Sequence, residues 1–243
     1  GAKVIYGLSR YKLFEKIAMD YEKVVIGLIS VFSGWVLAQF TSILKDFMRA
    51  RKVKKCLQQE LEELKSELER TLLIYSRMLQ IYGLKGIDNG SASPISNHIF
   101  KNYYKEAVLD LNKQQRISYQ LIHTLVEAAN NGMDELREVT GRLQERNILE
   151  GTSSISEQDG DLWGKKVICE FNNVAAAIWH IRYHLAYPKN PDLSPLTKSH
   201  EEYLKYLGSV EKHVAEIVDK AKNISREKFD EFYNPESFAN ELL

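Results

Sequence analysis

Apolar and polar positions divide the chain into one uninterrupted apolar stretch and several segments with helical periodicity. Residues 24–44 carry no charge, and a helix of that length crosses a hydrocarbon core of roughly 30 Å. We therefore expect a transmembrane helix at 23–45. A signal peptide fits less well, because the apolar run is too long and no small-residue cleavage motif closes it. The remaining alternative is a buried core helix.

The segment after the span predicts one unbroken helix from Asp46 to about Tyr82, since neither Gly nor Pro interrupts it. Its apolar positions recur every seven residues in two offset series, which is typical of the seam of a coiled coil or bundle. Leu72 and Leu79 widen this seam and favour packing within a globular bundle. The run QQELEELKSELER is expected to form the solvated face. The two series are Leu57, Leu64, Thr71 and Met78, and Leu61, Leu68, Tyr75 and Tyr82.

The rest of the chain alternates between polar loops and helical patterns. Loops rich in breaking residues are expected at 83–97 and 145–161. Helices are expected at 112–144, at 161–187 with Asp161 as N-cap, and at 200–224 with Ser199 as N-cap. On the first of these helices, the apolar face is expected to comprise Ile117, Leu121, Leu125 and Ala128.

These patterns predict an all-α protein in which a single transmembrane helix continues into a cytoplasmic helical bundle. Met19 would make a natural start, which would leave residues 1–18 as an upstream extension; the alternative is a short interfacial helix at 11–23. The expected segments are an N-terminal extension or interfacial segment at 1–22, a transmembrane helix at 23–45, a juxtamembrane amphipathic helix at 46–83, a helical bundle at 84–224 and a C-terminal tail at 225–243.

Charge gives the expected span a direction. The chain holds 33 basic and 33 acidic residues, so it has no overall attraction to nucleic acid. A basic cluster follows the span directly, and by the positive-inside bias we expect the C-terminal part to lie in the cytoplasm. We expect the membrane to be a prokaryotic inner membrane. Anionic lipid headgroups are the expected partner of this cluster, and nucleic acid is not. The cluster comprises Arg49, Arg51, Lys52, Lys54 and Lys55.

Small residues line one face of the expected span at spacings of three and four: Gly27, Ser30, Gly34 and Ala38. Such a face lets another membrane helix approach closely, so we expect a homo-oligomer formed through the spans. The alternative is that these residues are simply common in membrane helices. The amide of Gln39, which is costly in a membrane unless it is paired, also favours an oligomer.

Metal and cofactor chemistry finds little support in the residue pattern. Cys56 and Cys169 form no CxxC motif, so neither a disulfide framework nor a zinc site is indicated. His180 and His184 are four residues apart and could ligate a metal if Glu170 or His213 supplied a third ligand. We instead expect these histidines to lie in a hydrogen-bonded polar seam, and we expect no metal and no cofactor.

One stretch carries a catalytic alternative. Arg116 and His123 lie on one expected helix with six residues between them. This spacing resembles the motif of the helical HEPN ribonucleases, in which a dimer brings two such Arg and His pairs together over RNA. The residue after that arginine is usually polar, whereas Ile117 follows it here. The resemblance implies a membrane-tethered ribonuclease in which Arg116 and His123 are catalytic.

The architecture itself favours a role without catalysis. No phosphate-binding glycine loop, Gly-x-Ser-x-Gly or His-Glu-x-x-His motif is present in the sequence. We expect an oligomeric membrane-anchored effector or scaffold whose bundle binds a protein partner. Several membrane effectors of prokaryotic antiviral defence act by altering membrane permeability, and this architecture would suit such a role.

Overall fold

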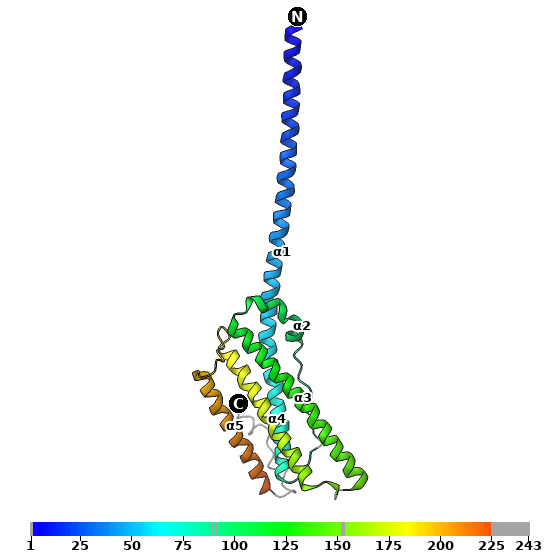
Figure 1. Cartoon of the computed structure of the whole chain (residues 1–243), viewed down its shortest axis with the longest axis vertical. Coiled ribbons are helices and arrows are strands. Elements are labelled where there is room, and N and C mark those ends of the chain that lie inside the picture. Colours follow the sequence, from blue (N-terminus) through cyan, green and yellow to red (C-terminus); the bar gives the residue numbers. More distant parts are fainter. Residues whose placement is uncertain (1, 89, 91, 152–153, 225–243) are drawn as a thin grey trace. The chain divides into compact units, whose positions relative to one another are not determined.

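The computed structural model describes residues 2–88, 90, 92–151 and 154–224, with side chains within these ranges at 21, 23 and from 25 onward. Every regular element in these ranges is a helix, which confirms the all-α class (Figure 1). The tail predicted at 225–243 lies outside the described residues. The elements are α1 (Ala2–Gly83), α2 (His98–Ala107), the 3-10 helix η1 (Val108–Asp110), α3 (Lys113–Glu150), α4 (Glu157–Ala186) and α5 (Lys198–Lys222).

The chain divides into two compact units, Gly1–Lys52 and Val53–Leu243, which we call unit 1 and unit 2. α1 contributes residues to both, and the predicted unbroken helix from Asp46 to Tyr82 is confirmed. The segment at 11–23, for which a short interfacial helix was one alternative, is helical and continuous with the rest of α1. No proline interrupts this part of the chain, so nothing in its covalent structure breaks the helix there.

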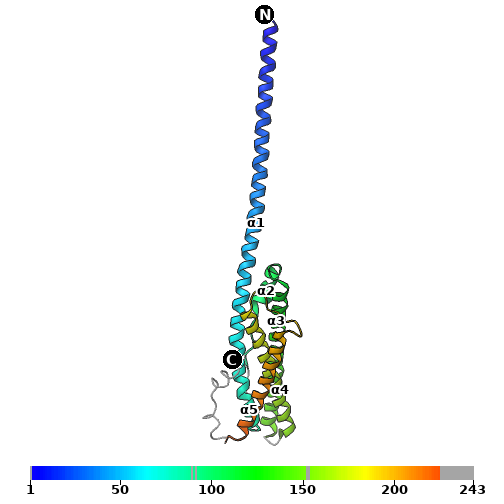
Figure 2. The ribbon, with the colours of Figure 1, turned by 90° about the vertical axis from the view of Figure 1, so that its left-hand side faces the viewer.

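In unit 2, α3, α4 and α5 form one layer, and the later part of α1 packs against one side of it. α4 contacts both α3 and α5 and runs in the direction opposite to them (Figure 1). The turned view shows α1 along one side of this layer (Figure 2). The segment between α1 and α2 is held to α3, since the Asn130 side chain accepts a hydrogen bond from Ile95 N at 2.8 Å and donates one to Ile95 O at 2.9 Å.

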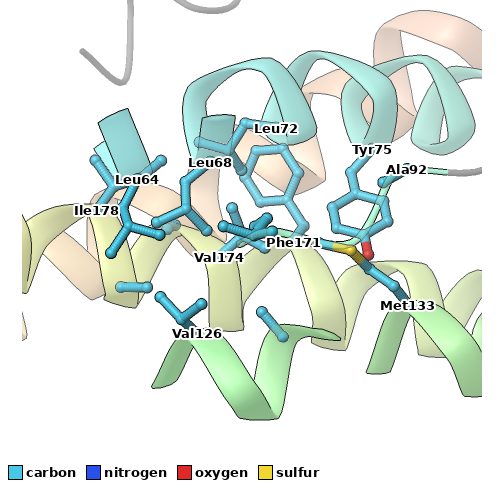
Figure 3. Close-up of a cluster of buried hydrophobic side chains, with 14 of the residues drawn as sticks. Leu64, Leu68, Leu72, Tyr75, Ala92, Val126, Met133, Phe171, Val174 and Ile178 are labelled. Atoms are coloured by element: carbon cyan, nitrogen blue, oxygen red, sulfur yellow. The ribbon is translucent and has the colours of Figure 1, made fainter. Parts of the chain in front are cut away.

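The core of unit 2 lies where α1 meets α3 and α4. The predicted seam is confirmed from Leu57 to Leu79, whose apolar members are at most 4% exposed, whereas Tyr82 at its end is only partly buried. Burial of a leucine side chain stabilises the fold by about 1.5–3 kcal/mol. Figure 3 shows side chains from α1 (Leu64, Leu68, Leu72 and Tyr75) facing Val126 and Met133 of α3 and Phe171, Val174 and Ile178 of α4.

The apolar face predicted for α3 was wrong at Ile117 and Ala128, whereas Leu121 and Leu125 are partly buried and Leu125 packs against the core. Ile117 is 46% exposed and Ala128 is also exposed, while the helix buries a neighbouring stripe. Both stripes have helical spacing, and only the packing of α1 and α4 decides between them. The apolar members of the buried stripe are Tyr119, Ile122, Val126, Ala129, Met133, Leu136 and Leu143.

Two helix starts and one loop also differ from the prediction. α4 begins at Glu157, because Ser156 and Asp159 form a capping box ahead of the predicted cap Asp161. α5 begins at Lys198 after Thr197, while the predicted cap Ser199 is buried and donates to Asp192 O at 2.8 Å. The predicted loop at 145–161 is shorter, because α3 continues to Glu150.

Candidate functional site

The first candidate site is the apolar segment of α1 within unit 1. Its large apolar side chains from Ile26 to Met48 are between 44% and 73% exposed, and no part of the apolar stretch is buried against the described chain. Among the described helices, α1 is the one with a stretch long and apolar enough to cross a membrane. A core helix of a soluble domain would have its apolar side chains covered. The buried-helix alternative is therefore disfavoured.

The small-residue face of this segment has no contact that explains its glycines. A Cβ added at Gly27 or Gly34 would meet nothing within 4 Å. At Gly83, by contrast, a Cβ would lie 2.6 Å from the Val218 carbonyl oxygen. The hydroxyl of Ser30 donates to Ile26 O at 2.8 Å, so this polar group is satisfied inside its own helix. The small side chains of this face therefore have no neighbour in the described chain at Gly27 and Gly34, and the Ser30 hydroxyl needs no partner from another helix.

The residues of the basic cluster after the apolar segment differ in their exposure and contacts. Arg49, Lys52 and Lys55 are exposed, and the exposed Arg51 guanidinium lies 5.6 Å from the ring centroid of Phe47. Lys54 differs because its side chain is half-buried. Its ammonium donates to the carbonyl oxygen of Asp110 at 3.4 Å and to Oε1 of Gln115 at 3.5 Å. Lys54 therefore ties α1 to η1 and to the start of α3, unlike the more exposed members of the cluster.

Glu60 of α1 lies at the centre of a buried polar contact. Its Oε1 accepts a hydrogen bond from Ile99 N at 2.6 Å and its Oε2 accepts one from Phe100 N at 2.9 Å. These amides belong to the first turn of α2, where backbone N–H groups have no partner within the helix. Burial raises the pKa of the Glu60 carboxyl, while the two amides partly oppose this shift. Glu60 thus caps α2 from another helix.

The sequence assigned Glu60 to the solvated face, which was wrong for this residue. Glu60 is 3% exposed, whereas its neighbours Glu62 and Glu63 are exposed as predicted. The signal that could have found it is its register, since Glu60 lies three residues after Leu57 and four before Leu64 on the buried face.

The structure places His123 in the interior and Arg116 at the edge of unit 2. The His123 ring is 2% exposed and stacks on Phe100, with ring centroids 3.7 Å apart. Burial lowers the pKa of His123 to about 3, with a further contribution from Lys101. Arg116 donates to Val108 O at 3.4 Å. No hydrogen bond or ion pair joins Arg116 to His123 within the described ranges, so the fold does not assemble them into one surface site.

The histidines of α4 are buried in the predicted polar seam. Nδ1 of His184 is 2.8 Å from the Ser118 hydroxyl of α3, which confirms the seam at this residue. His180 packs against Tyr203 of α5, with ring centroids 4.8 Å apart. Burial lowers the pKa of each histidine to about 4. No group of three metal-ligating side chains occurs in the part of the chain that the structure describes.

Glu170 lies ten residues, or almost three helical turns, before His180 on α4 and faces α3. Its carboxylate accepts a hydrogen bond from Asn173 at 3.3 Å and occupies the space where Gly132 has no side chain. Burial raises the pKa of the Glu170 carboxyl. Cys169 beside it is free and exposed, as is Cys56. This helix therefore combines buried polar packing with an accessible thiol.

A cavity that the sequence did not predict opens near the end of α1, with a volume of about 580 Å³. Its rim carries an ion pair between Lys85 and Glu157, with Nζ and Oε1 3.2 Å apart. The hydroxyl of Tyr82 donates to Asp161 at 3.4 Å. Among its lining residues, Gly160 is the glycine with open space beside it, because an added Cβ would meet nothing within 4 Å, and a single glycine in the sequence was too weak a signal to predict the cavity.

Comparison of the chain with protein-family models, curated proteins and solved structures gives no match.

Proposed function

We propose that this chain is a single-pass protein of a prokaryotic inner membrane whose helical bundle lies in the cytoplasm. The observation that carries the proposal is the exposed apolar segment of α1, in which every large apolar side chain from Ile26 to Met48 is uncovered. Leaving such a surface in water forfeits about 25 cal/mol for each Å² of apolar area. A bilayer is the solvent that matches it, and the length of the segment suits a hydrocarbon core of roughly 30 Å.

The proposed orientation is supported by the charges that follow the apolar segment. Arg49, Arg51, Lys52 and Lys55 are exposed on the helix immediately after it. Each basic residue near an anionic membrane surface contributes about 1 kcal/mol of attraction. The positive-inside bias then favours retention of unit 2 on the cytoplasmic side.

We also propose that the spans associate through Gly27, Ser30, Gly34 and Ala38. The two glycines of this face have no packing role in the described chain, and membrane helices associate through close backbone approach at such positions. The resulting oligomer would display several copies of unit 2, which we propose bind a protein partner. An effector that changes membrane permeability in antiviral defence is the biological role that we propose for this assembly.

The first experiment asks whether the span inserts and associates. The full chain is expressed in bacteria, and membranes are washed with alkaline carbonate, which releases peripheral proteins. We expect the chain to stay in the membrane pellet. Native mass spectrometry of the protein in lipid nanodiscs then counts the copies, and we expect more than one.

Two substitutions separate the small-residue face from a general effect of side-chain size. Gly34→Leu adds a bulky side chain to the face, and we expect it to lower the number of copies per nanodisc. Ser33→Leu adds a bulky side chain about 100° around the same helix and should leave the number unchanged. A monomeric wild-type chain, or equal effects of the two variants, would contradict association through this face. Release of the chain by carbonate would overturn the membrane anchor itself.

A further inference from the structure

One end of unit 2 exposes apolar side chains that the fold does not use. We call it the proximal end and define it as residues 107–113 and 187–198, the connections between α2 and α3 and between α4 and α5, which within unit 2 lie at the end of the bundle where Lys54 of α1 contacts Asp110 (Figure 1). Leu109 in η1 is 90% exposed and Leu196 is 92% exposed, and Tyr187 between them in sequence is 55% exposed. Leucines exposed to this extent make no contribution to the core.

Hydrogen bonds hold the two connections together as one surface. The Asn112 side chain donates to Lys189 O at 2.7 Å, and the Gln115 side chain donates to Pro188 O at 2.6 Å. Lys54 of α1 donates to Asp110 O at 3.4 Å, which fastens the same surface to α1. The exposed leucines are thus presented by a connected framework.

The conformation of Leu196 makes its exposure notable. Its φ is 64°, in the left-handed region that disfavours residues with a Cβ. Asp192 and Ser194 stabilise the turn before it, since the Asp192 carboxylate accepts from Ser194 N at 3.0 Å. The chain therefore holds an apolar side chain outward, in a backbone conformation that polar residues or glycine would occupy more readily.

Basic side chains lie on the same two connections as these apolar ones and outnumber the acidic side chains there, Asp110 and Asp192. Lys113, Lys189 and Lys198 are exposed on the same two connections and on the first turns of α3 and α5. Lys113 and Lys189 form no ion pair with a residue that the structure describes. Exposed apolar groups that share a surface with lysines are typical of a surface that lies in the headgroup region of an anionic bilayer.

Chain connectivity brings a bilayer within reach of this end. Val53, where unit 2 begins, is eight positions after Lys45, at the end of the apolar segment. A helix of that length spans about 12 Å. We propose that the proximal end docks on the membrane, with Leu109 and Leu196 inserted among anionic lipid headgroups. This inference rests on the proposed membrane anchor, and the test below separates the two.

The test measures the depth of a fluorescent label in the full chain. Cys56→Ser and Cys169→Ser remove the exposed native thiols, and single cysteines carry an environment-sensitive dye in nanodiscs of phosphatidylcholine and phosphatidylglycerol. We expect a quencher attached to the lipid headgroups to quench a label at Leu196→Cys at least twofold more than one at Leu149→Cys. Leu149 is 75% exposed near the end of α3, far along that helix from Lys113, and serves as the matched control.

Two further arms decide how a result is interpreted. A label at Ile29→Cys should be quenched by a quencher deep in the acyl chains, and failure of this arm would reject the membrane anchor. Quenching at Ile29→Cys with equal quenching at Leu196→Cys and Leu149→Cys would overturn the docking alone.

The last arm tests whether the leucines insert into the membrane or whether the surface is simply close to the membrane because α1 connects it to the span. A dye is attached to Asn190→Cys, at an exposed position of the same surface. Its quenching by labelled headgroups is measured in a chain that keeps both leucines and in a chain that also carries Leu109→Ser and Leu196→Ser. We expect the double substitution to reduce headgroup quenching at least twofold, and nanodiscs without phosphatidylglycerol to do the same. Unchanged quenching in both would overturn the proposal. Both leucines are exposed, so circular dichroism should show an unaltered helix content.

Discussion

The Glu60 carboxylate of α1 lies 3.8 Å from Nε2 of His123 in α3, in the buried interior of unit 2. The same carboxylate accepts two backbone hydrogen bonds from α2, and the ring of His123 stacks on Phe100 of α2. Three helices therefore meet at one acidic side chain. The helix that carries the apolar segment is also the helix that organises the bundle.

Replacement of Glu60 is expected to weaken this junction. Glu60→Leu leaves two buried amides of α2 without an acceptor, and we expect the free energy of unfolding to fall by about 2–4 kcal/mol. Glu60→Gln keeps one acceptor oxygen and should cost less. Urea denaturation of the detergent-solubilised chain, followed by circular dichroism, measures both. An equal loss in the two variants would contradict this account, because Gln keeps an acceptor oxygen that Leu lacks.

Acidification is expected to destabilise unit 2. Burial lowers the pKa of His123 to about 3 and those of His180 and His184 to about 4. In the unfolded chain the histidines have pKa values near 6.5. Below pH 6.5 the unfolded chain therefore binds more protons than the folded chain, so the free energy of unfolding falls as the pH falls below 6.5. Each histidine should contribute a loss of roughly 1 kcal/mol between pH 6.5 and 5.5.

Buried carboxyls oppose this trend. The pKa values of Glu60 and Glu170 are raised, so the folded chain retains their protons above pH 4.5 and gains stability as the pH falls through those values. Since three histidines act against two carboxyls, we expect a net loss between pH 7.5 and 5.5. Urea midpoints at the two pH values test this, and His180→Gln should reduce the difference. A higher midpoint at pH 5.5 would contradict the assignment of neutral buried histidines.

Two glycines in unit 2 should respond oppositely to alanine. A Cβ at Gly83 would lie 2.6 Å from the backbone oxygen of Val218 and 2.8 Å from Cβ of Ala221, so α5 must move. We expect Gly83→Ala to cost about 1–3 kcal/mol of stability. Gly208 within α5 has nothing within 4 Å, and Gly208→Ala should gain up to about 1 kcal/mol from helix propensity. Thermal unfolding of the two variants measures the change in stability. A similar loss of stability in both variants would contradict the prediction.

The purified chain is expected not to cleave RNA, because the His123 ring is buried under Phe100. Incubation with a labelled single-stranded RNA tests this. His123→Ala should instead lower the free energy of unfolding by about 2 kcal/mol through lost packing. RNA cleavage that disappears in both Arg116→Ala and His123→Ala, with helix content preserved, would support the ribonuclease alternative and contradict this expectation.

Sequence periodicity was sufficient for the elements and for the α1 seam, because a buried leucine every three to four residues is a local property. It failed where neighbouring elements decide the outcome. The buried stripe of α3 was assigned to Ile117 and Ala128 because two adjacent stripes have the same spacing. Glu60 was assigned to solvent because its partners, the amides of Ile99 and Phe100, come from a segment distant in the sequence. The same limit hid the exposed Leu109 and Leu196, which in the sequence resemble core residues.

Cysteine accessibility across the membrane tests the central claim most directly. Cys169 is exposed on unit 2, and with Cys56→Ser it is the only thiol of the chain. A membrane-impermeant maleimide should leave Cys169 unlabelled in intact spheroplasts and label it in inverted membrane vesicles. Tyr21→Cys, in a chain without the native cysteines, should show the reverse pattern, because Tyr21 lies before the apolar segment and is 72% exposed. Labelling of both positions from the same side would contradict a membrane span between them.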